Sequence, residues 1–180
     1  MGTFTTIPAA GAKLRGSVFS ALLTELRPVR AALSSDFPLA TGTGTLANVT
    51  GLVVPVAAST KYDGELWLGA QLAAGTTEDI SIAMTWPTGA TMYVATGELV
   101  TSATSFSGDF EMVWRAAHAS GAAIANAGLN ATLPTWTVMH FTLTVSTTAG
   151  NLQVQAAQVT PGANVVTVKA QSKLILHQAE

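Results

Sequence analysis

The stretch GNLQVQAAQVT, residues 150–160, alternates apolar and polar side chains and predicts a β-strand with two unlike faces. Leu152 and Val154 fall on one face, and we expect them to pack into a core because side chains alternate across a strand. Gln153 and Gln155 fall on the other face, where an open surface is better served by Lys and Glu. These two amides are therefore predicted to face a neighbouring subunit or an adjacent sheet.

The end of the same stretch is less regular. The pair Ala156–Ala157 interrupts the alternation, which predicts a bulge at this point. The face on which Gln158 lies is therefore left open. Buried amides need hydrogen-bond partners, because an unsatisfied one costs about 1–3 kcal/mol.

Period-two alternation recurs through most of the chain after Asp36, with Thr, Gly, Ala, Pro and Asn turns between the runs. Strands are predicted at 61–73, 79–86, 91–100, 109–117, 136–146, 151–159 and 164–177. Apolar faces are formed by Tyr62, Leu66, Leu68 and Leu72, by Ile80, Ile82, Met84 and Trp86, by Phe110, Met112 and Trp114, and by Met139, Phe141, Leu143 and Val145. This pattern predicts an all-β fold, an antiparallel β-sandwich of jelly-roll type, over residues 37–180.

The first 36 residues have a different pattern. Residues 1–11 are predicted to form an extended arm, and residues 12–27 a short α-helix that ends before Pro28. The apolar stripe of this helix consists of Leu14, Val18, Phe19, Leu22 and Leu26. A helix this short is marginal alone and needs packing. We therefore expect residues 1–36 to anchor the protein on a larger particle or to brace an oligomer.

Charge is scarce in this chain. Only 10% of its 180 residues are Asp, Glu, Lys or Arg, against about 25% in ordinary soluble domains. Such a surface is poor at keeping a free monomer soluble, which favours an assembly that buries much of it. The alternative explanation is a high-GC genome, which enriches alanine and glycine. The net charge is −2 and there is no basic run, so nucleic-acid binding is not expected. No signal peptide and no membrane-spanning run is recognised.

Residues that could carry chemistry do not form a recognisable catalytic or metal-binding set. His118, His140 and His177 lack the spacing of a metal site, and there is no cysteine. The pairs Asp63/Glu65 and Asp109/Glu111 each share a strand face, as acid–base or calcium-binding residues do. A solvated strand face accounts for them more simply. We expect no enzymatic activity, no metal and no cofactor.

The four tryptophans divide into two groups. Trp86 and Trp114 share their faces with Met and Phe, which predicts core positions. Trp67 lies opposite the face of Leu66 and Leu68, and Trp136 follows Pro134 at the start of a strand. Trp67 and Trp136 are therefore the candidates for a ligand site or an interface, with carbohydrate as one ligand class.

Two segments resemble small β-sandwich structural proteins of tailed-bacteriophage virions: NVTGLVVPVAASTKYDGELWLGAQL, from residue 48, and AGNLQVQAAQVTPGANVVTVKAQSKLIL, from residue 149. The matching positions are Leu52, Val54, Pro55, Val56, Ala58, Tyr62, Ala149, Gly150, Leu152, Gln153, Ala157, Gln158, Thr167, Val168, Lys169, Ala170, Ser172 and Leu174. The leader TIPAAGAKLRGSVFSALLTELRPV is similar as well, so the resemblance covers nearly the whole chain. Gln171 departs from the pattern, which has glycine there.

The resemblance implies a trimeric virion component, used as a capsid decoration protein, a head fibre or a minor tail protein, and it does not decide which. A single sandwich with a short leader fits a compact cap, so we expect a homotrimeric decoration protein that binds the major capsid protein. The alternative is a head fibre or minor tail protein, whose sandwich would bind a host-surface receptor such as a glycan. Neither role requires catalytic residues. The scarcity of charge and the uncharged strand at 150–160 agree with either role.

Overall fold

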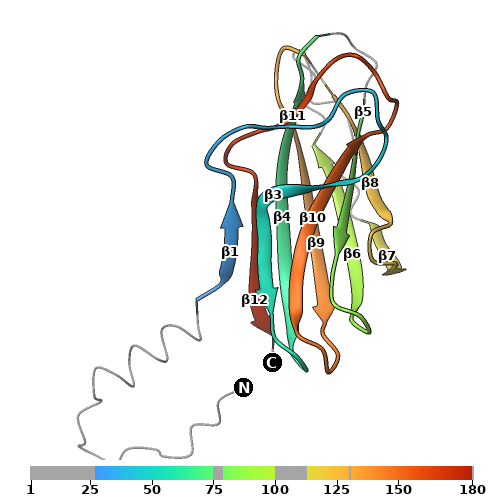
Figure 1. The fold of residues 1–180 in the computed structure, drawn as a ribbon. Helices are drawn as coiled ribbons and strands as arrows, with labels where there is room; N and C mark the ends of the chain where they lie inside the picture. Colours follow the sequence, from blue (N-terminus) through green and yellow to red (C-terminus); the bar gives the residue numbers. More distant parts are fainter. Residues whose placement is uncertain (1–26, 75–78, 100–112, 130, 180) are drawn as a thin grey trace, which may run out of the picture.

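The computed structural model describes residues 27–74, 79–99, 113–129 and 131–179, and this part of the chain folds into two antiparallel β-sheets (Figure 1). Sheet A has eight strands, six of them in the order β1-β12-β4-β9-β6-β7; β11 also pairs with β4, and β2 pairs with β11. Sheet B has four, in the order β3-β10-β5-β8. The strands are β1 (Val29–Ala32), β2 (Phe37–Pro38), β3 (Ala47–Val56), β4 (Lys61–Leu72), β5 (Asp79–Thr85), β6 (Thr91–Leu99), β7 (Val113–His118), β8 (Ala123–Gly128), β9 (Thr135–Thr144), β10 (Gly150–Gln158), β11 (Val166–Val168) and β12 (Lys173–Ala179).

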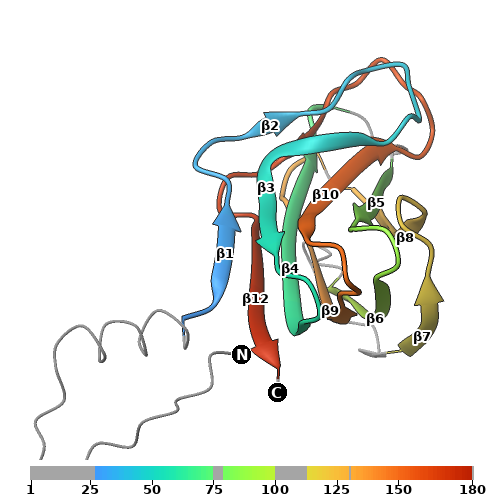
Figure 2. The same cartoon turned by 60° about the horizontal axis from the view of Figure 1, so that its bottom comes forward.

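The strand pairing is that of a jelly roll. Strand β3 pairs with β10, β4 with β9, β5 with β8 and β6 with β7, all antiparallel. These nested pairs form one long hairpin that is rolled up, so that successive pairs fall alternately in sheet B and sheet A. Strands β12 and β1 extend sheet A beyond β4, and Figure 2 shows them at the edge opposite β7. The predicted all-β, jelly-roll-type sandwich is confirmed.

The core lies between the sheets and is built from the alternate residues of their strands. Leu152 and Val154 of β10 are fully buried, as the alternation predicts. The predicted apolar faces of β4, β5 and β9 are buried as well. Gly64 leaves space in β4 for the ring of Phe141, because a Cβ atom there would lie 2.2 Å from the Phe141 Cζ atom. Both residues pair directly across β4 and β9.

Two predictions about single strands were wrong. The run 164–177 is two strands, β11 and β12, separated by a turn at residues 169–172. The bulge expected at Ala156–Ala157 lies instead in β3, because the β10–β5 pairing is regular through both alanines. Gln158 is buried.

The predicted arm and helix lie mostly outside the described residues. Of the segment 1–36, the structure describes residues 27–36, and these contribute β1, which pairs with β12 in sheet A. The division at residue 36 stays a prediction. Among the described residues, no helix has the length and hydrophobicity needed to cross a membrane.

The turn between β11 and β12 requires a left-handed backbone. The Ser172 N–H donates to the Lys169 carbonyl at 3.2 Å, and Gln171, at the third position of this turn, has a φ of 72°. A positive φ at this position defines a type II turn and favours glycine. Gln171 therefore departs from the resembling pattern at a place where glycine has a physical advantage.

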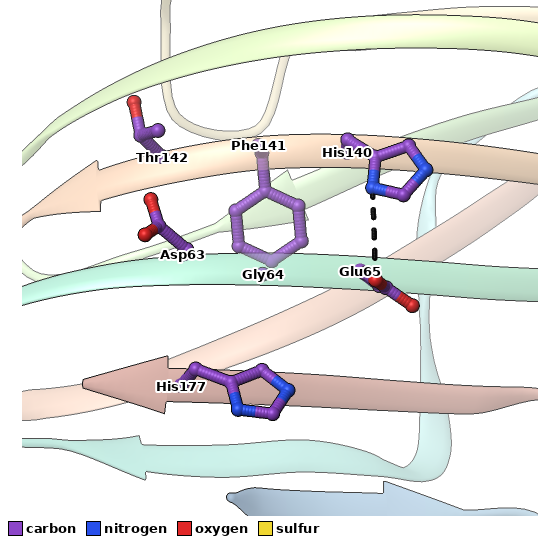
Figure 3. Close-up of a pocket in the computed structure, with 7 residues that line it drawn as sticks. All are labelled: Asp63, Gly64, Glu65, His140, Phe141, Thr142 and His177. Atoms are coloured by element: carbon purple, nitrogen blue, oxygen red, sulfur yellow. Dashed lines mark ion pairs between the residues drawn. The ribbon is translucent and has the colours of Figure 1, made fainter. Parts of the chain in front are cut away.

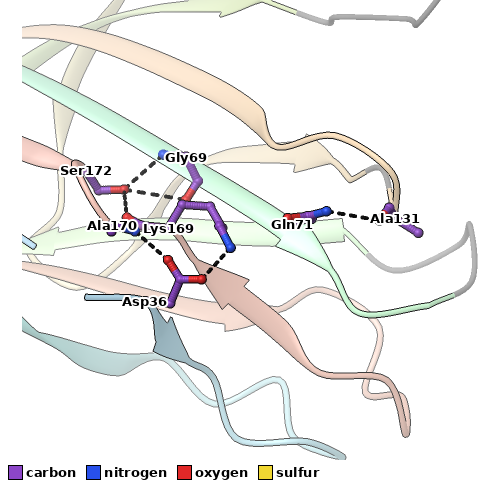
Figure 4. A network of polar contacts seen from close by, with 7 residues as sticks. All are labelled: Asp36, Gly69, Gln71, Ala131, Lys169, Ala170 and Ser172. Carbon is purple, nitrogen blue, oxygen red and sulfur yellow. Dashed lines mark hydrogen bonds and ion pairs between the residues drawn. The ribbon is translucent and has the colours of Figure 1, made fainter. Parts of the chain in front are cut away.

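Polar side chains hold this turn against the rest of sheet A (Figure 4). The buried Ser172 hydroxyl donates to the Lys169 carbonyl at 2.7 Å and accepts the Gly69 N–H at 3.1 Å. Asp36 accepts hydrogen bonds from the Lys169 ammonium and from the Ala170 N–H. The Lys169 hydrogen bond, and then that of Ala170, hold the pKa of the Asp36 carboxyl below its ordinary value of 3.8.

Replacing Gln171 with glycine should stabilise the fold. A left-handed conformation costs a non-glycine residue about 1–2 kcal/mol, and the extra entropy of unfolded glycine offsets about 0.5–1 kcal/mol of that gain. We expect Gln171→Gly to raise the free energy of unfolding by about 0.5–1 kcal/mol, measured by urea denaturation. Gln171→Val, which adds a β-branched residue at the same exposed site, should lower it. Equal stabilities for all three proteins would contradict the turn assignment.

The Asp36 network should make part of the stability depend on pH. Because the folded-state pKa of Asp36 is lowered, its contribution is complete above the unfolded value and is lost as the pH falls through the folded value. The stability difference between wild type and Asp36→Asn should therefore stay constant above about pH 5 and shrink below it. Lys169→Met should reduce the same acid dependence. An unchanged difference down to the acid transition would refute the network's role.

Candidate functional site

The outer face of sheet A gathers polar and aromatic side chains from four neighbouring strands: β12, β4, β9 and β6. The register aligns them in rows across the sheet. From β12 to β6, one row is His177, Asp63, Thr142 and Tyr93; the next is Ile175, Glu65, His140 and Ala95; the third is Lys173, Trp67, Val138 and Gly97. We call these three rows the sheet A face.

An open depression of about 490 Å³ lies in the first two rows of this face. Its polar lining comes from Asp63 and Glu65 on β4, His140 and Thr142 on β9, and His177 on β12. Figure 3 shows Asp63 beside Thr142 and Glu65 facing His140. The His140 Nδ1 and Glu65 Oε1 atoms are 3.8 Å apart, and both side chains are more than a third exposed. An ion pair this exposed contributes little to stability.

Trp67 is held at one end of this face by two contacts. Its indole N–H donates to Glu65 Oε2 at 3.0 Å, and the Lys173 Nζ atom lies 4.9 Å from the centre of its ring. Lys173 pairs with Trp67 across β12 and β4, so the ammonium stays near the ring. These contacts fix the ring while 36% of the residue remains exposed. A large aromatic side chain is thus presented in one orientation.

Trp136 lies next to Trp67 on the same face. It is paired with Gly69, and a Cβ atom at Gly69 would lie 2.9 Å from the Trp136 ring. The indole therefore covers the glycine of the neighbouring strand, as aromatic residues do in other sheets. Gly69 and Trp67 are two residues apart on β4, so the structure brings the two candidate tryptophans together.

The sheet A face offers hydrogen-bonding groups and aromatic rings. Within the described ranges, no three side chains of the His, Cys, Asp or Glu type lie close enough together to hold a metal ion. Asp63, Glu65, His140 and His177 are partly or fully open to solvent. Such a surface can bind a polar ligand through hydrogen bonds and ring contacts.

The outer face of sheet B has the opposite character. Among its four strands the only charged residue is Asp79, whereas β4 and β12 of sheet A carry Lys61, Asp63, Glu65 and Lys173. Val53 is exposed on this face, and Ala83 and Ala157 are buried in it. Gln153 and Gln155 lie between them. We call this the sheet B face.

The Gln153 side chain hydrogen-bonds to backbone carbonyls of its own chain where β3 is irregular. Between the pairs Gln153–Val53 and Gln155–Asn48, the single residue Val154 lies opposite residues 49–52, so β3 makes an excursion there. Gly51 supports the excursion with a φ of 95°. The Gln153 amide nitrogen is within 3.1 Å of the carbonyl oxygens of Val49 and Leu52, and within 2.8 Å of that of Val154. It therefore binds carbonyls that the excursion takes out of the ladder.

The other two glutamines of β10 have different partners. The Gln155 amide nitrogen donates to Asn48 Oδ1 at 2.9 Å on the exposed surface of the sheet B face. The buried Gln158 donates to the Asn164 carbonyl at 2.6 Å and accepts the Gly162 N–H at 3.1 Å. Gln158 thereby fixes the loop after β10. The predicted subunit contact of Gln153 and Gln155 is not tested by these intrachain bonds and stays a prediction.

The remaining candidates are distributed as follows. Leu14, Val18, Phe19, Leu22 and Leu26 lie outside the described residues, as do Asp109 and Glu111. His118 ends β7, away from His140 and His177 in the sheet order. Sequence reasoning missed Tyr93, which is 47% exposed on the sheet A face. The signal was its position between Met92 and Val94, both of which are buried.

No protein-family model and no curated protein matches this sequence. Solved structures of infectious bursal disease virus show a low structural similarity. For the Gt strain the match covers 85% of this chain and 42% of the other, at 12% identity and a TM-score of 0.22. For the Gx strain the match covers 84% of this chain and 40% of the other, at 16% identity and a TM-score of 0.25. The chain thus spans less than half of either matched chain, and at these TM-scores the similarity carries no argument about function.

The two neighbouring amides should respond differently to the same substitution. Gln153→Glu removes the donor and places a carboxylate against three carbonyl oxygens, so we expect a loss of about 1–3 kcal/mol in the free energy of unfolding at pH 7. Protonation restores a donor, so the loss should shrink at acid pH relative to wild type. Gln155→Glu keeps a partner within its own chain, because Asn48 can offer its own N–H groups, so the free energy of unfolding of the single chain should stay within about 0.5 kcal/mol. Any larger loss should depend on protein concentration, as the loss of a subunit contact does. Equal effects in urea denaturation would contradict the assignment.

Proposed function

We propose that this protein is a structural component of a bacteriophage virion, a homotrimeric decoration protein that binds the major capsid protein on the capsid surface. The observation that carries the proposal is the sheet B face, which has no charged residue in the described strands except Asp79. Buried charge is costly, whereas amides and small side chains can be buried with their hydrogen bonds made. A face of this kind is suited to contact with another copy of the chain.

The symmetry of a homotrimer makes the lack of charge useful. Near a three-fold axis, a residue lies close to the same residue of the other two subunits, so a charged side chain there would be repelled by its own copies. Val53 is 38% exposed, and Gln155 is half-buried beside the small residue Ala83. The chain-wide charge of 10% agrees with a surface that is largely covered in the particle.

Two further arguments support a virion role. The jelly roll is an architecture that viral capsid domains use often, which is an analogy of fold. The segments at residues 48–72 and 149–176 resemble tailed-phage virion proteins. In this proposal residues 1–36, with the stripe of Leu14, Val18, Phe19, Leu22 and Leu26, bind the capsid shell or brace the trimer. No enzymatic activity, metal or cofactor is part of the proposed function.

A minor tail or fibre-head role has the same support from fold and charge. The two differ in location, which a reconstruction of the phage particle would settle. Density for the jelly roll on the capsid shell supports a decoration protein. Density at the tail tip or on a fibre would replace that proposal with the tail role.

Light scattering on the purified full chain should give about three times the chain mass of 18.4 kDa. Val53→Glu introduces a charge on the sheet B face and should dissociate the trimer, because the carboxylate would be desolvated at the contact. Thr144→Glu is the matched control: it adds the same charge on sheet A, at an exposed position opposite Lys61. We expect this control to remain trimeric. A monomeric wild type at micromolar concentration, or a Val53→Glu variant that assembles normally, would overturn the proposed interface.

A further inference from the structure

The sheet A face carries two exposed aromatic side chains, at positions that neighbour the residues lining the depression. Trp67 is 36% exposed and Tyr93 is 47% exposed. They lie on β4 and β6, on either side of β9, and pair there with Val138 and Thr142. Strand spacing and rise then place their Cα atoms about 16 Å apart along a diagonal of the sheet. This span exceeds one sugar ring and matches a short oligosaccharide.

The groups between the two rings suit sugar hydroxyls. His140 lies midway on the diagonal and is paired with Glu65, and Asp63 and Thr142 lie in the same row as Tyr93. Ionised carboxylates accept hydrogen bonds, imidazole and hydroxyl groups both donate and accept, and a sugar hydroxyl can do either. The depression of about 490 Å³ gives these groups a common space, within the usual volume of ligand pockets.

The rings themselves are suited to stacking. Trp67 is fixed by its hydrogen bond to Glu65 and by the Lys173 ammonium near its ring, so little side-chain freedom remains to be lost on binding. Aromatic rings of Trp and Tyr combine an apolar surface with a polar edge. A sugar ring has a matching pair of surfaces, an apolar face of C–H groups and an edge of hydroxyls.

The charged groups that line the depression favour neutral sugars over acidic ones. Among the described residues, its polar lining holds two carboxylates, Asp63 and Glu65, and no Lys or Arg. Lys173 lies outside it, at the Trp67 ring. An acidic sugar would therefore be repelled from the centre of the face. We propose that the sheet A face binds a neutral oligosaccharide, with Trp67 and Tyr93 stacking on sugar rings and Glu65, His140, Asp63 and Thr142 binding hydroxyls between them.

This site is a property of the single chain and does not depend on the trimer or on a capsid partner. It also differs from the proposed assembly surface, since the two faces belong to different sheets. Its test can therefore fail while the proposed function stands, and the reverse also holds. A protein partner on this face is the competing occupant.

The experiment is an NMR titration of the full-length protein with three neutral trisaccharides, maltotriose, cellotriose and N,N′,N″-triacetylchitotriose, and with 3′-sialyllactose as the acidic probe. We expect millimolar or tighter binding of at least one neutral probe, with shift changes in β4, β6 and β9. Trp67→Ala and Tyr93→Ala should each weaken this binding about tenfold. Sialyllactose should bind more weakly.

Val53→Ala, on the opposite sheet, is the control and should bind as wild type does. Urea denaturation of each variant separates a lost contact from a lost fold; Tyr93→Phe, which keeps the ring, should retain most of the binding. The proposal is overturned if no neutral probe binds, if both alanine variants bind as wild type, or if sialyllactose binds as well as the neutral sugars. Binding changes confined to sheet B would overturn it too.

Discussion

The pairing of β3 with β10 is the contact on which the rest of the sandwich depends. It joins the two ends of the rolled hairpin, and every other pair of the jelly roll lies inside the loop that it closes. Closing a long loop costs entropy that must be recovered by the contacts made. Strand β10 makes such contacts on both of its edges, because it lies between β3 and β5, and it also directs Leu152 and Val154 into the core. The excursion of β3 at residues 49–52 interrupts this pairing, and the Gln153 side-chain amide donates hydrogen bonds to the carbonyls of Val49 and Leu52 there.

Regular alternation made β4, β5, β9 and β10 predictable, because each has one strongly apolar face that ends in the core. Strand β8, with the sequence AIANAG, was not predicted, since alanine and glycine give little contrast between faces. The break between β11 and β12 was also hidden, because the left-handed position is occupied by Gln171 and not by glycine. Both failures come from residues whose type does not reveal their conformation.

The candidate site was predictable only residue by residue. The opposite-face position of Trp67 indicated a surface role, and the structure places it 36% exposed. What sequence could not supply is the register, which aligns Trp67 with Lys173 and places His140 beside Glu65. The need for Gln153 was similarly invisible, because the carbonyls that it binds belong to a strand about a hundred residues earlier. Long-range pairing, which no local pattern encodes, decides both.

The two faces of the sandwich divide the scarce charge of the chain unequally, and our proposals give them different roles. The sheet B face, nearly free of charge, is assigned to contact between copies of the chain. The sheet A face, with its rings, carboxylates and histidines, is assigned to a ligand and must stay open. Gln153 and the Asp36 network fix the strands that carry these faces. The Asp36 network belongs to neither role, whereas Gln153 lies on the sheet B face, where its contact with a neighbouring subunit stays a prediction.

A crystal structure of the assembled full-length protein tests this division most directly. The account predicts three chains around a three-fold axis, with Val53 and Gln155 of each chain buried in the subunit contacts. It also predicts that Trp67 and Tyr93 remain open to solvent in the assembly. A trimer that buries Trp67 and Tyr93 between subunits and leaves the sheet B face in water would contradict it.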